Sequence, residues 1–195
     1  TKHYIGAIVS GIPGKFLLLS NQETLGAALD CLKGVLYPPE LLPGKTTAEI
    51  YKMMDTEAVQ SPPGANGVLL TPWLFGERSP INNPDLRGQI FNIDMNTTRA
   101  DLSRAVMEGV ALNIRWGMEF VEKISLKKSK PSTDEVRLIG GASKSDIWCR
   151  IFADVLQKPI VQMKNAQMAS AQGAAAVAMV AFGIYRDFSE TDRML

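Results

Sequence analysis

The sequence holds little cysteine, almost no histidine and almost no net charge. Its 195 residues include two cysteines and one histidine, and 21 basic residues nearly balance 20 acidic ones, which leaves a net charge of +1. Two isolated cysteines, Cys31 and Cys149, supply neither a disulfide framework nor a metal-ligand spacing, so we predict buried thiols in a cytoplasmic protein. The balanced charge gives no basis for binding nucleic acid. The most apolar stretch, residues 169–184, is too short to span a membrane comfortably, so we expect no membrane partner.

Strand-like and helix-like segments predict one α/β unit. Two β-rich runs at 4–10 and 15–19 flank a Gly-Ile-Pro-Gly turn, which is typical of a hairpin. Further strands are expected at 68–73, 89–93, 135–139 and 159–162, and helices at 22–35, 46–58, 145–156, 169–183 and from 98 onward. Thr46 or Thr47 and Thr98 are the expected N-caps of their helices. Because the chain opens at Thr1 and runs directly into a strand, we interpret it as a piece of a longer protein.

The sharpest local motif joins a strand to a helix through two glycines, in VRLIGGASKSDIW at residues 136–148. Glycines let a backbone come close to a ligand, and a helix N-terminus offers unpaired N–H groups and a positive dipole end. This arrangement suits phosphates or the face of a nucleoside. A tight strand–helix turn without any ligand explains the same residues equally well. The motif is neither GxGxxG nor GxxxxGKS, so it supports neither a Rossmann dinucleotide site nor a P-loop.

A polar loop, GERSP at residues 76–80, precedes a long amphipathic helix that carries Glu108. Charged residues between two strands usually form a solvated loop. A carboxylate well inside a helix with a strong apolar face needs a partner, because an unpaired buried charge is costly. We therefore expect Glu108 to pair with a loop group such as Arg78 and to order the loop.

In this order and spacing, the segments resemble the second domain of the FGGY carbohydrate kinases, a family that includes xylulokinase, ribulokinase, gluconokinase and glycerol kinase. The resemblance covers about residues 15–188. Three motifs carry it: the loop PWLFGERSP, a strand and helix that end in Glu-Gly, and the Gly-Gly turn with the Ala/Gly-rich helix that follows. The matching residues are Gly88, Ile90, Phe91, Ile93, Asp101, Leu102, Ala105, Val106, Glu108, Gly109, Gly140, Gly141, Ser145, Trp148 and the helix at 169–183.

The resemblance implies a ribonuclease-H-like domain of the actin/hexokinase-type ATPase fold, with a mixed sheet and flanking helices, that binds ATP with Mg²⁺. In this family the Gly-Gly turn approaches the adenosine and the α-phosphate. A glycine at a helix start and a polar residue one turn later lie near the nucleotide phosphates. The residues that the resemblance assigns to nucleotide binding are Gly26, Asp30, Gly140, Gly141, Ala142 and Ser145.

The resemblance also implies that the catalytic base and most sugar contacts belong to an N-terminal domain that is not part of this chain. We therefore assign no catalytic residue and no metal ligand here, and residues 1–195 are expected to form the C-terminal, nucleotide-binding domain alone, without useful activity. The implied parent reaction transfers the γ-phosphate of ATP to a hydroxyl of a sugar or polyol. The GERSP loop and the strand after it look most like xylulokinase-type members, so a pentulose such as xylulose is the expected substrate.

Two alternatives stay open. Ala142 stands where many members have a third glycine, and Cys31 stands where the first helix usually has tryptophan. These departures leave room for a non-catalytic binding or dimerisation module that kept the fold, and an exposed apolar cleft surface would favour a homodimer. The second alternative is another enzyme of the same superfamily, acetate-kinase-like or hexokinase-like, against which the GERSP loop and the 88–108 segment argue.

Overall fold

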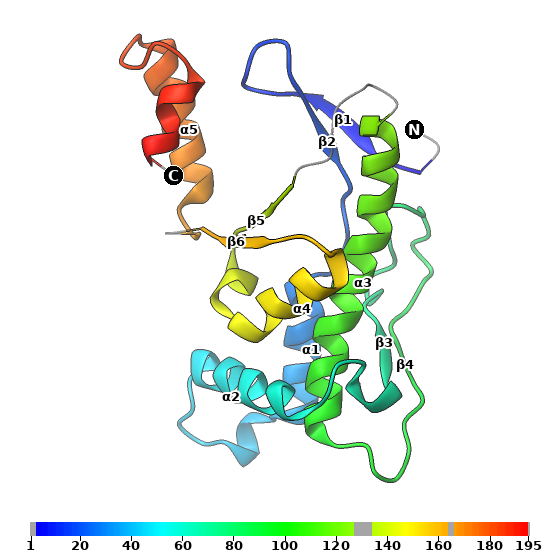
Figure 1. Cartoon of the computed structure of the whole chain (residues 1–195). Coiled ribbons are helices and arrows are strands. Elements are labelled where there is room, and N and C mark those ends of the chain that lie inside the picture. The colour runs from blue at the N-terminus through cyan, green and yellow to red at the C-terminus, as the bar shows by residue number, and fades with distance from the viewer. Residues whose placement is uncertain (1–2, 127–133, 164–165, 195) are drawn as a thin grey trace.

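A long central helix organises the molecule, and the helices at 26–36, 47–60 and 146–156 pack along it (Figure 1). The structure is a computed structural model that describes residues 3–126, 134–163 and 166–194. The helices are α1 (Gly26–Leu36), α2 (Thr47–Gln60), α3 (Arg99–Leu126), α4 (Asp146–Leu156) and α5 (Ala169–Ala181), with short 3₁₀ segments η1 (Pro39–Leu41), η2 (Ala65–Gly67), η3 (Gly141–Lys144) and η4 (Phe188–Met194). Helices α1, α2 and α4 pack against the lower half of α3, which runs to the upper end of the molecule in Figure 1.

One hydrophobic core lies among these helices. Helices α1, α2, α3 and α4 each contribute a stripe of apolar residues at helical spacing, which is why the sequence folds into amphipathic helices here. The buried residues include Ala28, Leu29 and Leu32 of α1, Ile50, Met54 and Ala58 of α2, Ala105, Val106, Met107, Val110 and Ala111 of α3, and Trp148, Ile151, Phe152 and Leu156 of α4. This core fixes the positions of the segments that begin α1 and α4.

The strands pair two by two rather than in one continuous sheet. The pairs are β1 (Gly6–Val9) with β2 (Phe16–Leu19), β3 (Leu69–Thr71) with β4 (Gln89–Phe91), and β5 (Val136–Leu138) with β6 (Ile160–Gln162). The first two pairs are antiparallel and the third is parallel, so both pairing directions occur. All the predicted strands form, each shorter than expected by one to three residues. No described strand bridges the hairpin and the parallel pair.

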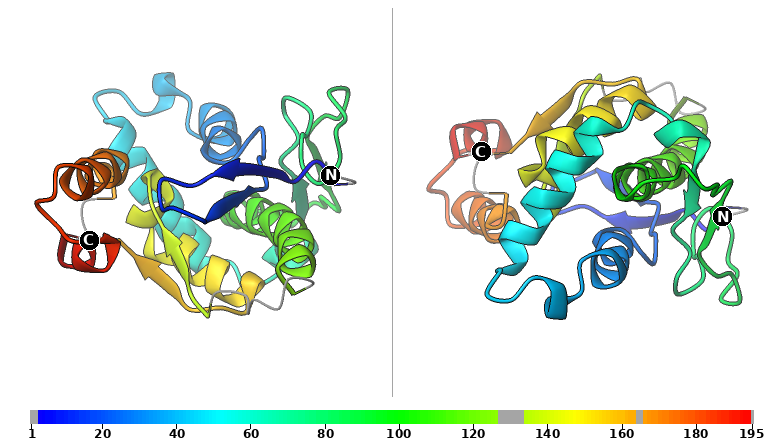
Figure 2. Two further views of the ribbon diagram at one scale, coloured as in Figure 1. Left: turned by 90° about the horizontal axis from the view of Figure 1, so that it is seen from above. Right: turned by 90° about the horizontal axis from the view of Figure 1, so that it is seen from below.

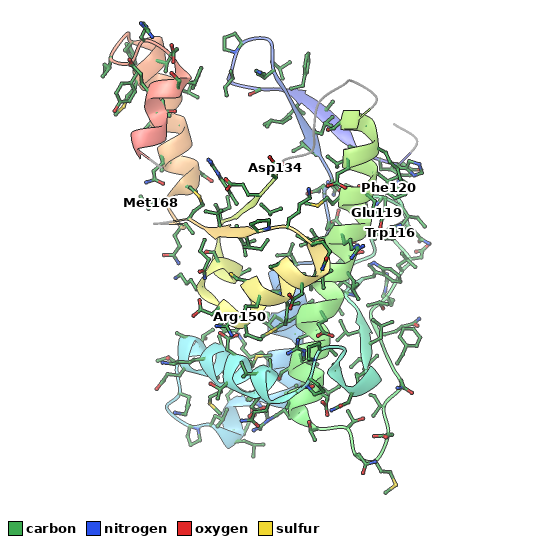
Figure 3. All side chains as sticks on the ribbon, in the orientation of Figure 1. Trp116, Glu119, Phe120, Asp134, Arg150 and Met168 are labelled. Atoms are coloured by element: carbon green, nitrogen blue, oxygen red, sulfur yellow. The ribbon has the colours of Figure 1, made fainter. Side chains whose placement is uncertain are left out.

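The upper part of the molecule holds the β1–β2 hairpin and the α5–η4 unit. Seen from above, the hairpin lies between α3 and α5–η4 (Figure 2, left). A Cβ placed on Gly11, in the hairpin turn, would lie 3.3 Å from Cγ2 of Val177 on α5. Two aromatic contacts join residues of other segments to α3. The ring centroids of His3 and Phe120 are 3.9 Å apart, and those of Trp73 and Trp116 are 6.4 Å apart. Figure 3 labels Trp116 and Phe120 on the upper half of α3.

The predicted N-caps of α2 and α3 are confirmed, whereas α1 begins at Gly26, four residues later than expected and without a side-chain cap. In α2 the Thr46 backbone N–H donates to Oε2 of Glu49 at 2.8 Å, and the Glu49 N–H donates to Oγ1 of Thr46 at 3.3 Å. This reciprocal pair is a capping box. Thr98 and Asp101 repeat the arrangement before α3, with N–H···O distances of 2.9 Å and 3.3 Å. The polar residues that the sequence placed before the helices therefore satisfy the first backbone donors.

Two expectations about single residues are wrong. Cys149 is buried as predicted, but Cys31 is exposed, because it lies outside the buried stripe that Ala28, Leu29 and Leu32 form on α1. Glu108 pairs with Arg104 on the same helix, with Nε and Oε1 2.6 Å apart, and its loop partner is the Gly64 N–H at 3.1 Å and not Arg78. Residues four apart on a helix are neighbours, so the partner was closer than the loop. Among the described residues, no helix is both long enough and apolar enough to cross a membrane.

Candidate functional site

The Gly-Gly turn has open space beside its backbone. Strand β5 ends at Leu138, and Gly140 follows with φ +81° and ψ −160°, a conformation that L side chains rarely adopt. A Cβ placed on Gly140 or Gly141 would meet no atom within 4 Å, so space is open beside this backbone. Gly109 is a glycine with no such space, since a Cβ placed there would lie 2.0 Å from the carbonyl oxygen of Leu70. Glycine serves close packing at position 109 and accessibility at the turn.

Ser145 holds the turn against the helices. It is buried at the N-terminus of α4, where its Oγ accepts a hydrogen bond from the Trp148 N–H at 3.2 Å. The same hydroxyl donates to Oδ1 of Asp55 on α2 at 2.8 Å. Ser143 closes the turn by donating to the Gly140 carbonyl oxygen at 2.7 Å. The Ser145 hydroxyl thus already donates and accepts within the protein, so its clearest role is to fix the turn. Ala142 is buried, on the core side of the turn.

The second predicted segment begins α1. Gly26 is the first residue of this helix, it is exposed, and a Cβ there would meet nothing within 4 Å. The preceding residue, Leu25, offers no side-chain cap to the first N–H groups. Asp30 lies one turn later, and its Oδ1 accepts from Nζ of Lys33 at 2.8 Å and from the hydroxyl of Tyr51. The Lys33 bond, and then the Tyr51 bond, lower the pKa of Asp30, so this carboxyl is an anion that already has a cationic partner.

Helix α2 connects the two segments. Tyr51 bonds to Asp30 on α1, and Asp55, one turn further along α2, bonds to Ser145 beside the Gly-Gly turn. Residues four apart share a helix face, so α1 and the turn are attached to the same face of α2. Burial raises the pKa of Asp55, and the Ser145 bond opposes that rise. Figure 3 shows Arg150 of α4 on the side that faces α2.

A network around Glu77 was missed by the sequence analysis. This carboxylate is 2% exposed and accepts hydrogen bonds from Nδ2 of Asn113 at 2.6 Å and from the N–H groups of Arg78 at 2.8 Å and Glu23 at 3.3 Å. The Arg78 guanidinium pairs with the Glu23 carboxylate at 2.6 Å. The GERSP loop therefore anchors the segment that leads into Gly26. An acid beside a glycine in a polar loop was the available signal, and it does not by itself indicate burial.

An open surface depression lies elsewhere. It has a volume of about 520 Å³, opens at the C-terminal end of α2 and the start of α3, and is lined by Glu57, Gln60, Ser61, Asn66, Asn96, Thr98, Arg99, Ala100 and Asp101. Its charged groups have partners within the protein: Arg99 Nε donates to the Glu57 carboxylate at 2.8 Å, and Asp101 accepts a hydrogen bond from the Ser61 hydroxyl at 2.6 Å. The nucleotide residues predicted from sequence are not among its lining residues. Over the described part of the chain, no three His, Cys, Asp or Glu side chains cluster as a metal site.

Comparison with known proteins decides the family. Residues 13–182 match the model of the C-terminal domain of the FGGY family of carbohydrate kinases. That match includes both glycine segments and the GERSP loop. The chain belongs to this family. The resemblance inferred from the three motifs is confirmed.

The most similar relatives include several xylulose kinases. The chain is 34% identical over 179 residues to the xylulose kinase of Staphylococcus xylosus, which is 92% of this chain and 34% of that protein. It is 33% identical over 180 residues to the xylulose kinase of Bacillus subtilis, again with 92% and 33% covered. A gluconokinase of Bacillus licheniformis is 28% identical over 146 residues, 74% of the chain and 27% of the relative. The chain thus spans about a third of the length of the curated relatives it matches.

Solved structures agree with the fold. The xylulose kinase of Rhodospirillum rubrum has a TM-score of 0.74 at 27% identity, with 92% of this chain and 33% of that chain covered. The glycerol kinase of Plasmodium falciparum, solved with ADP, has a TM-score of 0.71 at 18% identity, with 99% of this chain and 37% of that chain covered. The second likeness is one of fold alone. The predicted ribonuclease-H-like, actin-type α/β class is confirmed.

Proposed function

We propose that this chain is the nucleotide-binding part of an ATP-dependent carbohydrate kinase that transfers the γ-phosphate to a sugar or polyol hydroxyl. The observation that carries the proposal is the open backbone at Gly140 and Gly141, held beside α1 by α2, in a chain of the FGGY family. Phosphoryl transfer depends mainly on positioning and electrostatic stabilisation, so a rigid cradle for the nucleotide is a contribution that this domain can make.

Each candidate residue has a role in this proposal. Gly140 and Gly141 present backbone to the adenosine and α-phosphate, while Gly26 lets the phosphates approach the first turn of α1. Ser145 holds the turn near the adenine, with Ala142 packed on its core side.

Mg²⁺ would accompany ATP and neutralise charge on its phosphates. Asp30 carries the one carboxylate among the proposed residues, and carboxylate oxygens are ligands that Mg²⁺ prefers. Lys33 and Tyr51 both donate to Oδ1 of Asp30. Asp30 would hold the hydrated magnesium ion, which would neutralise charge on the phosphates.

A pentulose such as xylulose is the proposed substrate, because several of the most similar relatives are named xylulose kinases. The general base that accepts the sugar hydroxyl proton would come from the part of these relatives that lies outside the matched third. Residues 1–195 alone are then expected to bind nucleotide without turning it over. A cytoplasmic location follows from the proposed use of ATP.

Calorimetric titration with Mg·ATP and Mg·ADP tests the proposal. The variant Gly141→Asp adds a carboxylate in open space beside the turn, so it should fold normally and abolish binding. Gly34→Asp is the matched control, because Gly34 is also exposed with no atom within 4 Å of a Cβ. Binding that Gly141→Asp removes and Gly34→Asp keeps supports the proposal. A folded intact protein that binds neither nucleotide contradicts it.

A non-catalytic module that dimerises is the second candidate function. The favouring observation is exposed apolar surface on the hairpin, where Val9 is 77% and Phe16 68% exposed. A coupled ATPase–kinase assay of the intact protein with a panel of pentuloses, hexonates and polyols separates the two candidates. Turnover with any of these sugars supports the kinase. A dimer in sedimentation analysis without turnover or nucleotide binding supports the module.

A further inference from the structure

Helix α2 carries two polar side chains that end at the two halves of the proposed nucleotide site. Tyr51 and Asp55 are four residues apart, and both are half-buried between α2 and its neighbours. Neither residue was predicted from the sequence to belong to the site, because tyrosine and aspartate are common at the surface of amphipathic helices. Their partners, Asp30 and Ser145, lie far away along the chain but are both assigned to the site.

The Asp55 contact fixes the adenosine side. Asp55 accepts a hydrogen bond from Oγ of Ser145 at 2.8 Å, and this donation orients the Ser145 lone pairs toward the Trp148 N–H at 3.2 Å. The η3 segment from Gly141 to Lys144 is short and precedes Ser145 directly. A hydrogen bond to a charged acceptor at its end therefore limits how far Gly141 can move. Burial of the Asp55 carboxylate strengthens the bond, because the local dielectric is low.

The Tyr51 contact fixes the phosphate side. The Tyr51 hydroxyl donates to Oδ1 of Asp30, which also accepts from Lys33 at 2.8 Å. The Lys33 ammonium lies 4.7 Å from the centroid of the Tyr51 ring, a cation–π distance. Asp30, Lys33 and Tyr51 thus bind one another between α1 and α2. These contacts fix the rotation of α1 about its own axis, and that rotation sets the direction in which Gly26 faces.

We infer that Tyr51 and Asp55 are positioning residues, which hold α1 and the Gly-Gly turn at one separation so that a nucleotide meets both halves of its site at once. The inference rests on the proposed function and extends it from residues that touch the nucleotide to residues that act through Asp30 and Ser145. Preorganisation of this kind raises affinity because the protein loses less freedom when the ligand binds.

The test is calorimetric binding of Mg·ADP to the intact protein at a temperature well below unfolding. Asp55→Ala removes the acceptor of the Ser145 bond and is expected to weaken binding about tenfold. Asp55→Asn keeps an acceptor oxygen and is expected to restore affinity to within about twofold of wild type. Thr56→Ala is the control, because the Thr56 hydroxyl donates only to the Lys52 carbonyl within α2. Sugar affinity, measured in parallel, should not change in any of these variants.

A double-mutant cycle separates positioning from general stability. If Asp55 acts through Ser145, Asp55→Ala should cost no further affinity in a Ser145→Ala background. Tyr51→Phe deletes only the hydroxyl that reaches Asp30, and it should weaken Mg·ADP binding by about fivefold with little change in unfolding temperature. If Asp55→Ala does not fold, Tyr51→Phe decides the question alone.

Unchanged Mg·ADP affinity in Asp55→Ala and Tyr51→Phe, with binding intact in wild type, overturns the inference and leaves the proposed function standing. Equal loss in Asp55→Ala and Asp55→Asn also overturns it, because the hydrogen bond to Ser145 would then not be the cause. Failure of the wild-type protein to bind Mg·ADP overturns the proposed function and this inference together.

Discussion

The lower, helical half of the molecule and the upper half, which holds the hairpin and α5, differ in how far their apolar side chains are buried. In the helical half Phe152 is 1% exposed, and it packs in one core with Met54 and Val106. In the upper half Phe16 is 68% and Phe182 83% exposed. The segments of the proposed nucleotide site, α1 and the Gly-Gly turn, are attached to the packed half through α2. The comparison indicates that the helices form the rigid scaffold and the hairpin and α5 form an apolar surface open to contact.

The largest expected effect comes from the same substitution made in both halves. Phe152→Ala should lower the free energy of unfolding by about 3–5 kcal/mol, because it removes a ring from a close-packed core. Phe16→Ala should change it by less than about 0.5 kcal/mol, because the ring is largely exposed. Urea unfolding of both variants measures the difference. Equal losses would show that the hairpin is part of the core.

A smaller effect is expected at the start of α3. The hydroxyl of Ser61 and then that of Thr98 lower the pKa of the buried Asp101 from 3.8 to about 2. The ionised form therefore stabilises the fold at pH values above 3.8, and that stabilisation is lost as the pH falls through about 2. Asp101→Asn should cost roughly 2 kcal/mol at pH 7 and much less near pH 2. Thermal unfolding against pH measures this, and a cost that does not depend on pH would refute the assignment.

Charge on the hairpin should act on association rather than on folding. If the exposed strand surface binds another copy of the chain, Phe16→Glu should weaken self-association about tenfold, since the new carboxylate would be desolvated at the contact. Sedimentation velocity over a concentration series measures the association constant, and Glu40→Gln, on the exposed η1 segment, is the control. An association constant that Phe16→Glu leaves unchanged would assign any dimer to another surface.

The smallest effect is expected at Asp55. Burial raises the pKa of this carboxyl, so its ionised form is disfavoured in the fold and stability increases as the pH falls through the folded pKa. Asp55→Asn should therefore be slightly more stable than wild type at pH 7, and the advantage should vanish in acid. Differential scanning calorimetry at both pH values checks the sign. A lower unfolding temperature at pH 7 would mean that the carboxylate charge stabilises the fold.

Local features of the structure were predictable from sequence, and cross-chain partners were not. Thr46 and Thr98 were expected as caps because capping depends on residues three positions apart. The Gly-Gly turn was expected because its strand and helix are adjacent in sequence. The partner of Glu108 was assigned to the wrong arginine, since a distant loop was preferred to a neighbour on the same helix.

The residues that hold the candidate site were the hardest to predict. The Ser145–Asp55 bond spans 90 positions, and the Glu77–Asn113 bond spans 36. No local spacing rule connects such residues, because the packing of α2 and α3 brings them together. Glycine identity alone also could not separate Gly109, which permits close packing, from Gly141, which borders open space.

The most direct measurement is a glycine-selective NMR titration of the intact protein with Mg·ADP, which observes the backbone N–H groups that the proposal assigns to the nucleotide. The amide signals of Gly26, Gly140 and Gly141 are expected to shift, while those of Gly64 and Gly67, which flank Asn66 of the open depression, are not. Shifts confined to Gly64 and Gly67, or none at saturating Mg·ADP, would contradict a nucleotide site between α1 and the Gly-Gly turn.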